Sequence, residues 1–274
     1  MEKENYIELL KWSLTDYLRT DRVEHKPIGP STFASYKKIL YHLNKLLKWK
    51  GYTICKTYLP DKEKRYFGHD WPLNAETMIG IQRLDNIEYC VGEILDQKIE
   101  GDFIEAGVWR GGAVIFMKAL LKVNKDSDRK IWVADSFCGL PRPNEKRYAQ
   151  DAGDLHYTHT ELAVSKEIVE NNFRKYKLLD DKVCFLEGWF KDTLPRAAMD
   201  KLALIRLDAD MYESTMDGLK NLYPKLSKGG FLIVDDWGAV DACKQAVIDY
   251  RMEYGILEEI IPIDWGGVYW KKLH

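Results

Sequence analysis

Apolar and polar positions follow two different rhythms along the chain, and the change falls near residue 100. Before it, apolar side chains recur at helical spacing, with lysines on much of the opposite face. The helices expected from this spacing are 6–18, 39–47 and 74–95. A loop at 27–30 separates the first two, with Ser31 or Thr32 as a candidate cap for the second. A polar loop over 60–71 is expected before the third.

From Asp102 onward, short apolar runs alternate with helical patterns. This alternation is typical of βαβ units, which form a mostly parallel sheet covered by helices on both faces. The predicted strands are 102–106, 130–135, 182–187, 202–208, 229–235, 257–262 and 266–271. The predicted helices are 113–123, 161–176, 214–226 and 240–254. The segment 263–265 is too short for a parallel crossover, so the last two strands are expected to pair antiparallel.

A mostly parallel seven-stranded sheet with a terminal antiparallel hairpin is the layout of class I S-adenosylmethionine-dependent methyltransferases, a Rossmann-like α/β fold. A dinucleotide-binding Rossmann domain normally lacks that hairpin. We therefore expect a methyltransferase domain over 101–274 and an N-terminal helical extension, or cap, over 1–100. The polar stretch 137–160, with His156 and His159 near its end, is expected to be a lid rather than a disordered loop.

Composition adds mainly exclusions. The 274 residues are 46% hydrophobic and 31% charged, with a formal charge of -2, so charge gives no argument for nucleic acid or an anionic membrane. No apolar stretch reaches the ~18 residues of a membrane helix. The polar start, Met1–Asn5, is unlike a secretory signal, and the expectation is a cytoplasmic protein that acts on a small molecule.

Four acidic residues follow two of the predicted strands: Asp208 and Asp210, then Asp235 and Asp236. If the strands are neighbours, these carboxylates converge at the edge where α/β sheets bind ligands. Like charges that close need a cation or a proton, and Mg²⁺ prefers carboxylate and water oxygens. A lone Asp at a strand end is more often a helix cap, but two pairs make that harder to hold for all four. We predict that Asp208, Asp235 and Asp236 bind the metal, with Asp210 beside it.

A glycine-rich turn, Ile104–Gly112, joins the first strand of the alternating part to its helix. Gly107 and Gly111 would let the backbone turn tightly and approach a ligand. The spacing is acidic-x-Gly-x-x-x-Gly rather than GxGxxG, which weakens a dinucleotide interpretation. We expect Glu105 and the backbone at Gly107 to face the amino-acid part of S-adenosylmethionine; a turn needed only for packing is the alternative.

Two further strand ends carry candidate cofactor contacts. Asp135, followed by Ser136, can accept hydrogen bonds from ribose hydroxyls, a pattern that also fits NAD and FAD. Gly188 and Trp189 could border an adenine, although a simple turn explains them nearly as well. Four tryptophans at strand ends indicate either pocket walls or core packing: Trp109, Trp189, Trp237 and Trp265.

Taken together, these segments resemble the macrocin O-methyltransferase family. The resemblance rests on Glu105–Gly112, Asp135–Pro141, Leu207–Thr215, Val234–Gly238 and Asp264–Trp270. It reaches into the N-terminal part through Thr77–Gly80 and Arg83–Ile87, and so spans most of the chain.

The resemblance implies Mg²⁺-dependent methyl transfer from S-adenosylmethionine to a hydroxyl of a sugar or glycosylated natural product, as in antibiotic biosynthesis. Asp208, Asp235 and Asp236 match the family's metal ligands, and Asp210 matches its proposed general base. Homo-oligomers, dimeric or larger, and a mobile lid are also implied. The residues expected to bind the cofactor are Thr77, Met78, Glu105, Gly107, Trp109, Gly111, Asp135, Ser136, Gly188, Trp189 and Asp208.

This chemistry suits the residues present. A sugar hydroxyl is a poor nucleophile at neutral pH; coordination to Mg²⁺ lowers its pKa, and a neighbouring carboxylate can take the proton. Two alternatives remain open: a catechol-type O-methyltransferase with the same metal and fold, and a non-catalytic module that only binds S-adenosylmethionine. The residues give no indication of which sugar or scaffold is methylated.

Overall fold

A seven-stranded sheet forms the centre of the computed structural model, which describes residues 2–27 and 35–274. Its strand order is β5-β4-β3-β6-β7-β9-β8. The strands are β3 (Asp102–Ala106), β4 (Ile131–Asp135), β5 (Val183–Glu187), β6 (Leu202–Leu207), β7 (Leu226–Val234), β8 (Ile261–Pro262) and β9 (Val268–Lys271). Strands β3 to β7 pair in parallel, β9 pairs antiparallel with β7, and β8 pairs antiparallel with β9.

The predicted parallel sheet and its closing hairpin are therefore confirmed. The strand expected over 257–262 is shorter than predicted, because only Ile261 and Pro262 pair with β9, opposite Tyr269 and Val268. The order of strands places β6 beside both β3 and β7, so the ends of these three strands lie together. The register aligns Leu207 of β6 with Val234 of β7, one residue before Asp208 and Asp235.

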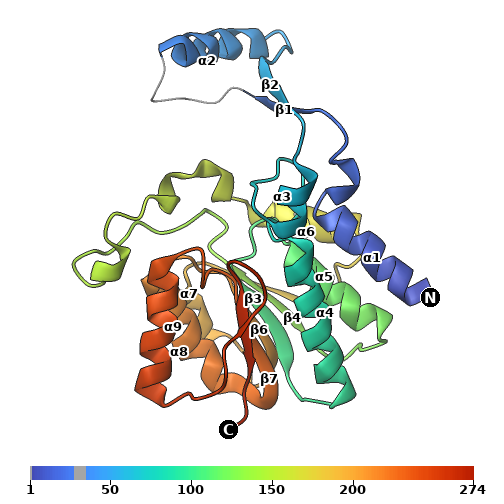
Figure 1. Ribbon diagram of the computed structural model, residues 1–274, viewed down its shortest axis with the longest axis vertical. Helices are drawn as coiled ribbons and strands as arrows, with labels where there is room; N and C mark the ends of the chain where they lie inside the picture. The colour runs from blue at the N-terminus through green and yellow to red at the C-terminus, as the bar shows by residue number, and fades with distance from the viewer. Residues whose placement is uncertain (1, 28–34) are drawn as a thin grey trace.

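Helices cover both faces of the sheet (Figure 1). One helix precedes the first strand of the sheet, α4 (Ile81–Asp96). The helices that follow strands are α5 (Gly112–Val123), α6 (Lys166–Lys175), α7 (Phe190–Thr193), α8 (Tyr212–Leu222) and α9 (Asp241–Tyr254). Alternate strand residues face opposite sides, as the pleat requires. Phe103 and Val133 pack in the apolar cluster of α4, α5 and α6, whereas Ile104 and Ala134 pack in the cluster of α8 and α9.

The N-terminal helix α1 (Glu2–Leu14) packs on the same side as α4 and α5. Ile7, Leu10 and Leu14 are buried there, in one cluster with Phe103 of the sheet. Of the apolar positions expected to form the stripe of this helix, Leu10 and Leu14 face the core, whereas Tyr6, Leu9 and Leu18 are exposed. The helix ends at Leu14 rather than at residue 18, and a 3-10 turn, Tyr17–Arg19, follows it. The division of the chain into two parts at residue 100 stays a prediction.

An arm stands out from the sheet and its helices at the top of Figure 1. It consists of β1 (Glu24–Pro27), α2 (Ser35–Lys48) and β2 (Cys55–Tyr58), and the two strands pair antiparallel from Glu24 opposite Tyr58. This pair of strands was not expected, because each strand has only four residues and little apolar alternation. The expected loop at 27–30 begins at the end of β1, and its remainder and the candidate cap lie outside the described residues.

Two expectations between residues 60 and 81 are wrong. The polar loop contains a short helix, α3 (Lys62–Phe67), whose first turn is capped by Asp61: its carboxylate accepts from the N–H of Lys64 at 3.0 Å. The third predicted helix begins at Ile81 rather than at residue 74. Gly80 before it is extended and packs so closely on α3 that a Cβ would lie 2.4 Å from the carbonyl oxygen of Tyr66.

The expected lid, 137–160, contains short 3-10 turns rather than a regular helix or strand. These turns are Ala149–Asp151 and His156–Thr158, and a third follows at Thr160–Leu162. Across the part of the chain that the structure describes, none of the helices combines the length and apolar character needed to cross a membrane.

Candidate active site

A cavity of about 600 Å³ opens at the carboxyl edge of the sheet. Its walls come from the ends of β3 to β7, from the lid, and from the segment 68–79 that precedes α4. Asp210, Asp235 and Asp236 line it. So do ten of the expected cofactor-binding residues: Thr77, Met78, Glu105, Gly107, Trp109, Asp135, Ser136, Gly188, Trp189 and Asp208.

The two glycines of the turn have different surroundings. Gly107 has φ +89°, and a Cβ there would lie 1.7 Å from the carbonyl oxygen of Asp208. Only glycine fits, because the β3 turn and the β6 end touch through their backbones. Gly111, at φ +86°, precedes α5, and its Cβ would lie 2.8 Å from Val169 of α6. Gly111 therefore packs against α6 and is not among the described residues that line the cavity, and its contact with the cofactor stays a prediction.

Asp135 holds the glycine turn from the neighbouring strand. Its carboxylate accepts from the N–H of Val108 and from that of Phe137, each at 2.8 Å. Burial raises the pKa of Asp135, and the backbone N–H donors oppose this shift. The carboxylate thus has a clear local task in shaping the turn, and its contact with a ribose stays a prediction.

Three carboxylates meet at the ends of β6 and β7. Asp208, Asp210 and Asp236 each offer an oxygen, and these atoms lie within 4.8 Å of one another. Asp236 also joins the two strand ends: its Oδ2 accepts from the N–H of Ala209 at 3.1 Å and from that of Asp210 at 3.0 Å. Asp210 has φ 54°, in the left-handed region that is uncommon for residues other than glycine.

The electrostatics of this trio are those of crowded negative charge. Burial, followed by repulsion from nearby carboxylates, raises the pKa of Asp208 and of Asp236 well above the usual range. The same causes raise the pKa of Asp210 to about 8. Three oxygen donors in this arrangement match the preference of a hard divalent cation such as Mg²⁺, which would relieve the repulsion.

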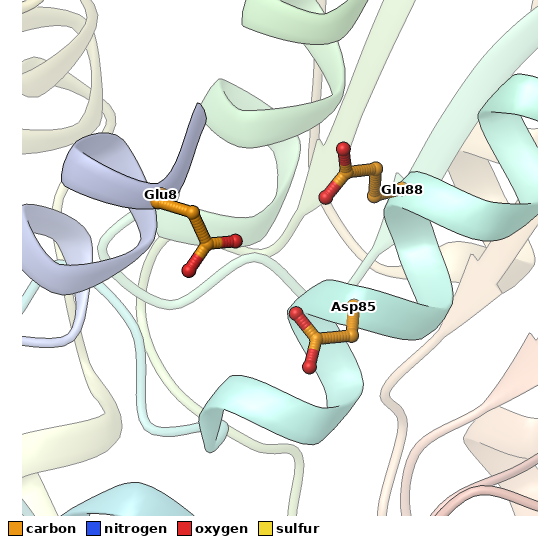
Figure 2. Close-up of side chains that lie close together, drawn as sticks. All are labelled: Glu8, Asp85 and Glu88. Atoms are coloured by element: carbon orange, nitrogen blue, oxygen red, sulfur yellow. The ribbon is translucent and has the colours of Figure 1, made fainter. Parts of the chain in front are cut away.

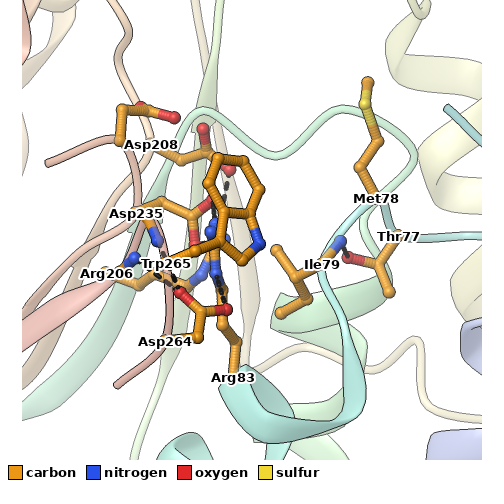
Figure 3. Close-up of polar contacts among 12 residues, drawn as sticks. Thr77, Met78, Ile79, Arg83, Arg206, Asp208, Asp235, Asp264 and Trp265 are labelled. Carbon is orange, nitrogen blue, oxygen red and sulfur yellow. Dashed lines mark hydrogen bonds and ion pairs between the residues drawn. The ribbon is translucent and has the colours of Figure 1, made fainter. Parts of the chain in front are cut away.

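Asp235 lies beside the trio but has other partners. Its Oδ1 accepts from Nη2 of Arg206, and its Oδ2 accepts from Nη1 of Arg83 (Figure 3). Burial acts to raise the pKa of Asp235, but the two guanidinium groups hold it below the usual value. To bind a metal as predicted, Asp235 would have to exchange an arginine partner, whereas Asp210 already faces the other two carboxylates.

The arginines continue this network to both sides. Arg206 Nη1 donates to Glu105 and, at 2.9 Å, to Asp208 Oδ2, while Arg83 Nε donates to Asp264 Oδ2 at 2.8 Å (Figure 3). Sequence reasoning assigned no role to either arginine. A signal existed for Arg206, because it is the one charged residue in the buried strand Leu202–Leu207. Arg83 comes from α4, and nothing local to that helix indicates its distant partners.

Glu105 supplies a polar atom that fits a cofactor. Burial raises its pKa to about 8, although Arg206 pairs with one of its oxygens. The other oxygen, Oε2, is buried with no hydrogen-bond partner among the described residues. A buried acceptor without a donor is costly. A ligand with an ammonium or hydroxyl group, such as S-adenosylmethionine, could satisfy it.

Three of the four strand-end tryptophans are walls of the cavity, which was one of the two roles expected for them. Trp109, Trp189 and Trp265 line it, whereas Trp237 packs under Lys244 and is not among the described lining residues. Trp109 Nε1 donates to the carbonyl of Glu161 at 2.9 Å, which fastens the end of the lid to the glycine turn.

A second group of acids lies outside the cavity. Glu8 of α1 and Asp85 and Glu88 of α4 also bring carboxylate oxygens within 4.8 Å of one another (Figure 2). The ammonium of Lys11 sits among them, at 2.7, 2.6 and 2.7 Å respectively. This group therefore already contains its cation.

Known proteins similar to this chain are methyltransferases. The macrocin-O-methyltransferase (TylF) family matches residues 3–272. A demethyldecarbamoylnovobiocin O-methyltransferase of Streptomyces niveus is 53% identical over 212 residues, 77% of this chain and 81% of the relative. An 8-demethyl-8-(2,3-dimethoxy-alpha-L-rhamnosyl)-tetracenomycin-C 4'-O-methyltransferase of Streptomyces olivaceus is 53% identical over 213 residues, again 77% and 81%.

A solved structure extends the similarity over the whole fold. The O-methyltransferase NovP has a TM-score of 0.83 and 43% identity, and the match covers 99% of this chain and 100% of that chain. The matched region contains the glycine turn, the strand-end carboxylates and the terminal hairpin described above. This chain therefore belongs to the macrocin O-methyltransferase family and is an S-adenosylmethionine-dependent O-methyltransferase.

Proposed function

We propose that this enzyme methylates a hydroxyl of a sugar carried by a glycosylated small molecule, with Mg²⁺ bound at Asp208 and Asp236. The carrying observation is the convergence of Asp208, Asp210 and Asp236 in the same cavity as the glycine turn. The relatives support the acceptor class, because one is named for a novobiocin precursor and another for a rhamnosyl tetracenomycin.

The donor set fits the metal. All three groups are carboxylates, and their raised pKa values follow from burial and mutual repulsion, which a divalent cation would remove. When bound, Mg²⁺ lowers the pKa of an acceptor hydroxyl. S-adenosylmethionine carries the methyl group on a sulfonium sulfur, and the resulting thioether is a good leaving group.

The residues of the chain have distinct tasks in this proposal. Asp210 accepts the proton of the acceptor hydroxyl. The hydroxyl oxygen forms a bond to the methyl carbon while the bond between that carbon and the sulfur of S-adenosylmethionine breaks. The products are the methyl ether and S-adenosylhomocysteine, and the proton remains on Asp210 until solvent removes it. Arg206 and Arg83 hold Asp235 and the neighbouring carboxylates in place.

The walls of the cavity favour alignment of the acceptor with the methyl donor. Trp265 borders it at the end of the sheet, and its Nε1 donates to the carbonyl of Phe67 at 3.0 Å. His69 packs edge-on against Trp265, at 5.0 Å between ring centroids. Such rigid apolar surfaces suit the rings of a glycoside and exclude water from the reacting atoms.

A substrate panel tests the proposal. Purified enzyme with S-adenosylmethionine and Mg²⁺ is offered demethyldecarbamoylnovobiocin, a rhamnosyl tetracenomycin and a set of catechols, and products are followed by mass spectrometry. We expect transfer to a sugar hydroxyl, loss of turnover with EDTA and recovery with added Mg²⁺. Faster methylation of a catechol would favour the catechol-type alternative. Binding of S-adenosylhomocysteine without any methylated product would favour the binding module.

The metal assignment has its own test. In Asp236→Asn, we expect the calorimetric affinity for Mg²⁺ and the turnover to fall together, because one of the oxygen donors is removed. Glu88→Gln, in the group of acids around Lys11, is the matched control and should change neither. Full activity in metal-free buffer would contradict the role of Mg²⁺.

A further inference from the structure

Asp151 of the lid has an unusual position for a carboxylate. It is only 1% exposed, and it lies in the 3-10 turn Ala149–Asp151. Its Oδ1 accepts from the backbone N–H of Tyr212 at 2.6 Å, and its Oδ2 accepts from that of Glu213 at 3.0 Å. A residue of the lid thus holds two backbone groups in the first turn of α8.

The first turn of α8 needs this partner. The first N–H groups of a helix have no acceptor within the helix, and a side chain just before it normally supplies one. Here that position is Met211, whose thioether makes no capping hydrogen bond. The acidic cap comes instead from Asp151, 61 residues earlier in the chain. A carboxylate also suits the positive end of the helix dipole.

The cap acts on the segment that carries the reaction. Asp210 is separated from Tyr212 by Met211 alone, and Asp210 has φ 54°. On its other side, the N–H of Asp210 donates to Asp236 at 3.0 Å. The bend at Asp210 is therefore held between two carboxylates, Asp236 just after β7 and Asp151 of the lid. Aspartate tolerates this region of φ better than most residues, and the two flanking contacts fix where its side chain lies.

The same part of the lid also borders the cavity. Tyr148 packs on the ring of Tyr212, with 5.6 Å between centroids. Asp154, three residues after Asp151, accepts from the backbone N–H of His156 and contacts its Nδ1, both at 2.8 Å, and the His156 ring lines the cavity. The position of the lid that covers the cavity is thus the same position in which Asp151 caps α8.

We propose that Asp151 is a positioning residue that makes the placement of Asp210 depend on the seated lid. The inference rests on the proposed function of Asp210 as proton acceptor. When the lid leaves, α8 loses both capping hydrogen bonds and the bend at Asp210 loses one of its two supports. The base is therefore fully aligned only while the acceptor is covered, which limits contact between water and the reacting atoms.

The experiment compares Asp151→Ala with Asp151→Asn, whose single amide oxygen can still accept from one of the two helix N–H groups. Glu145→Ala is the control, because Glu145 is a lid acid whose carboxylate accepts from Gly153 within the lid at 3.2 Å. Hydrogen exchange measured by mass spectrometry reports the segment 208–216 without any substrate. Steady-state kinetics with the best glycoside acceptor report kcat and the KM for S-adenosylmethionine.

For Asp151→Ala, we expect exchange of this segment to become roughly tenfold faster and kcat to fall by about tenfold, the size of one lost helix cap. The KM for S-adenosylmethionine should not change, because the glycine turn is untouched. Asp151→Asn should recover part of both losses, because one of the two capping hydrogen bonds can still form, and Glu145→Ala should behave as the wild type. A purely structural role would instead lower stability in both Asp151 variants without a specific loss of kcat.

Two results would overturn the inference. One is unchanged exchange of 208–216 in Asp151→Ala. The other is wild-type kcat in that variant. Failure of the proposed function is a separate result: the wild type itself would methylate none of the glycosides, while the exchange measurement would still decide whether Asp151 holds the bend.

Discussion

Two groups of three carboxylates in this enzyme each bring oxygen atoms within 4.8 Å of one another, yet only one of the two is a candidate metal site. Glu8, Asp85 and Glu88 gather between α1 and α4, and Asp208, Asp210 and Asp236 gather at the sheet edge. The first group surrounds the ammonium of Lys11, and its acids are each 41% to 50% exposed. The second group lies in a cavity, where Arg206 pairs with Asp208 at 2.9 Å, while Asp210 and Asp236 have no ion pair with a basic side chain among the described residues.

The difference shows that distance alone does not identify a metal site. Carboxylates attract a cation when they are crowded, shielded from water and not already neutralised. The Lys11 group fails the last condition, and water screens its exposed oxygens. The strand-end group is crowded and lies in a cavity, and of its three acids only Asp208 has an ion pair with a basic side chain among the described residues. Asp235 resembles the acids around Lys11, because two arginines already pair with its oxygens even though it lies within the active site.

The largest expected effect separates the roles within the strand-end group. Asp210→Asn should lower kcat by roughly 10²–10⁴-fold, because the amide cannot take the proton. Asn tolerates the left-handed φ of this position, so the fold and the calorimetric affinity for S-adenosylhomocysteine should be retained. Glu187→Gln, at the exposed end of β5, is the matched control. Turnover equal to that of the wild type would remove Asp210 as the base.

Asp235→Asn tests whether Asp235 is neutralised by arginines, as the contacts indicate, or binds the metal, as the sequence suggested. Loss of its charge leaves Arg206 and Arg83 buried with less compensation, so the free energy of unfolding should fall by roughly 3–5 kcal/mol. Denaturant unfolding measures this, and Mg²⁺ titration of the folded variant gives the second readout. A stable variant that no longer binds Mg²⁺ would identify Asp235 as a ligand.

Lys11→Met tests whether Lys11 is the cation that neutralises the group of acids between α1 and α4. Without its ammonium, the group of Glu8, Asp85 and Glu88 becomes a cluster of uncompensated charge, and the free energy of unfolding should fall by about 1–3 kcal/mol after allowance for solvent screening. Added Ca²⁺ or Mg²⁺ should then raise the melting temperature of the variant more than that of Lys3→Met, a change on the exposed face of the same helix, because the proposed site at Asp208 and Asp236 responds to the metal in both variants. Equal responses of the two variants would show that Lys11 is not the resident cation.

Much of the fold could be predicted because its signals are local. The alternation of apolar runs and helical patterns indicates the strands β3 to β7 and the helices between them, and the short connection 263–265 requires a hairpin. The two strands of the arm and α3 were missed, since these elements are short and their apolar pattern is weak, whereas α2 (Ser35–Lys48) confirms the helix expected over 39–47. The start of α4 was misplaced because close packing of Gly80 on α3, a tertiary contact, ends the preceding loop.

The site divides in the same way. The strand-end acids and the glycine turn are visible in the sequence, because parallel strands deliver the residues after them to one edge. The partners of those acids are not visible, since they come from elsewhere in the chain: Arg83 lies 152 residues before Asp235, and Asp151 lies 61 residues before Tyr212.

The class of fold, the edge where ligands bind and the residue types available there can be inferred from the sequence, because the spacing of apolar positions and the short connection 263–265 are local features. The order of the strands follows from packing between remote segments, and so do the grouping of the carboxylates and their pairing with a cation. Charge balance depends on distances between side chains that are remote in the chain, and Lys11 and Arg206 show how one ammonium or guanidinium changes what a group of acids can bind.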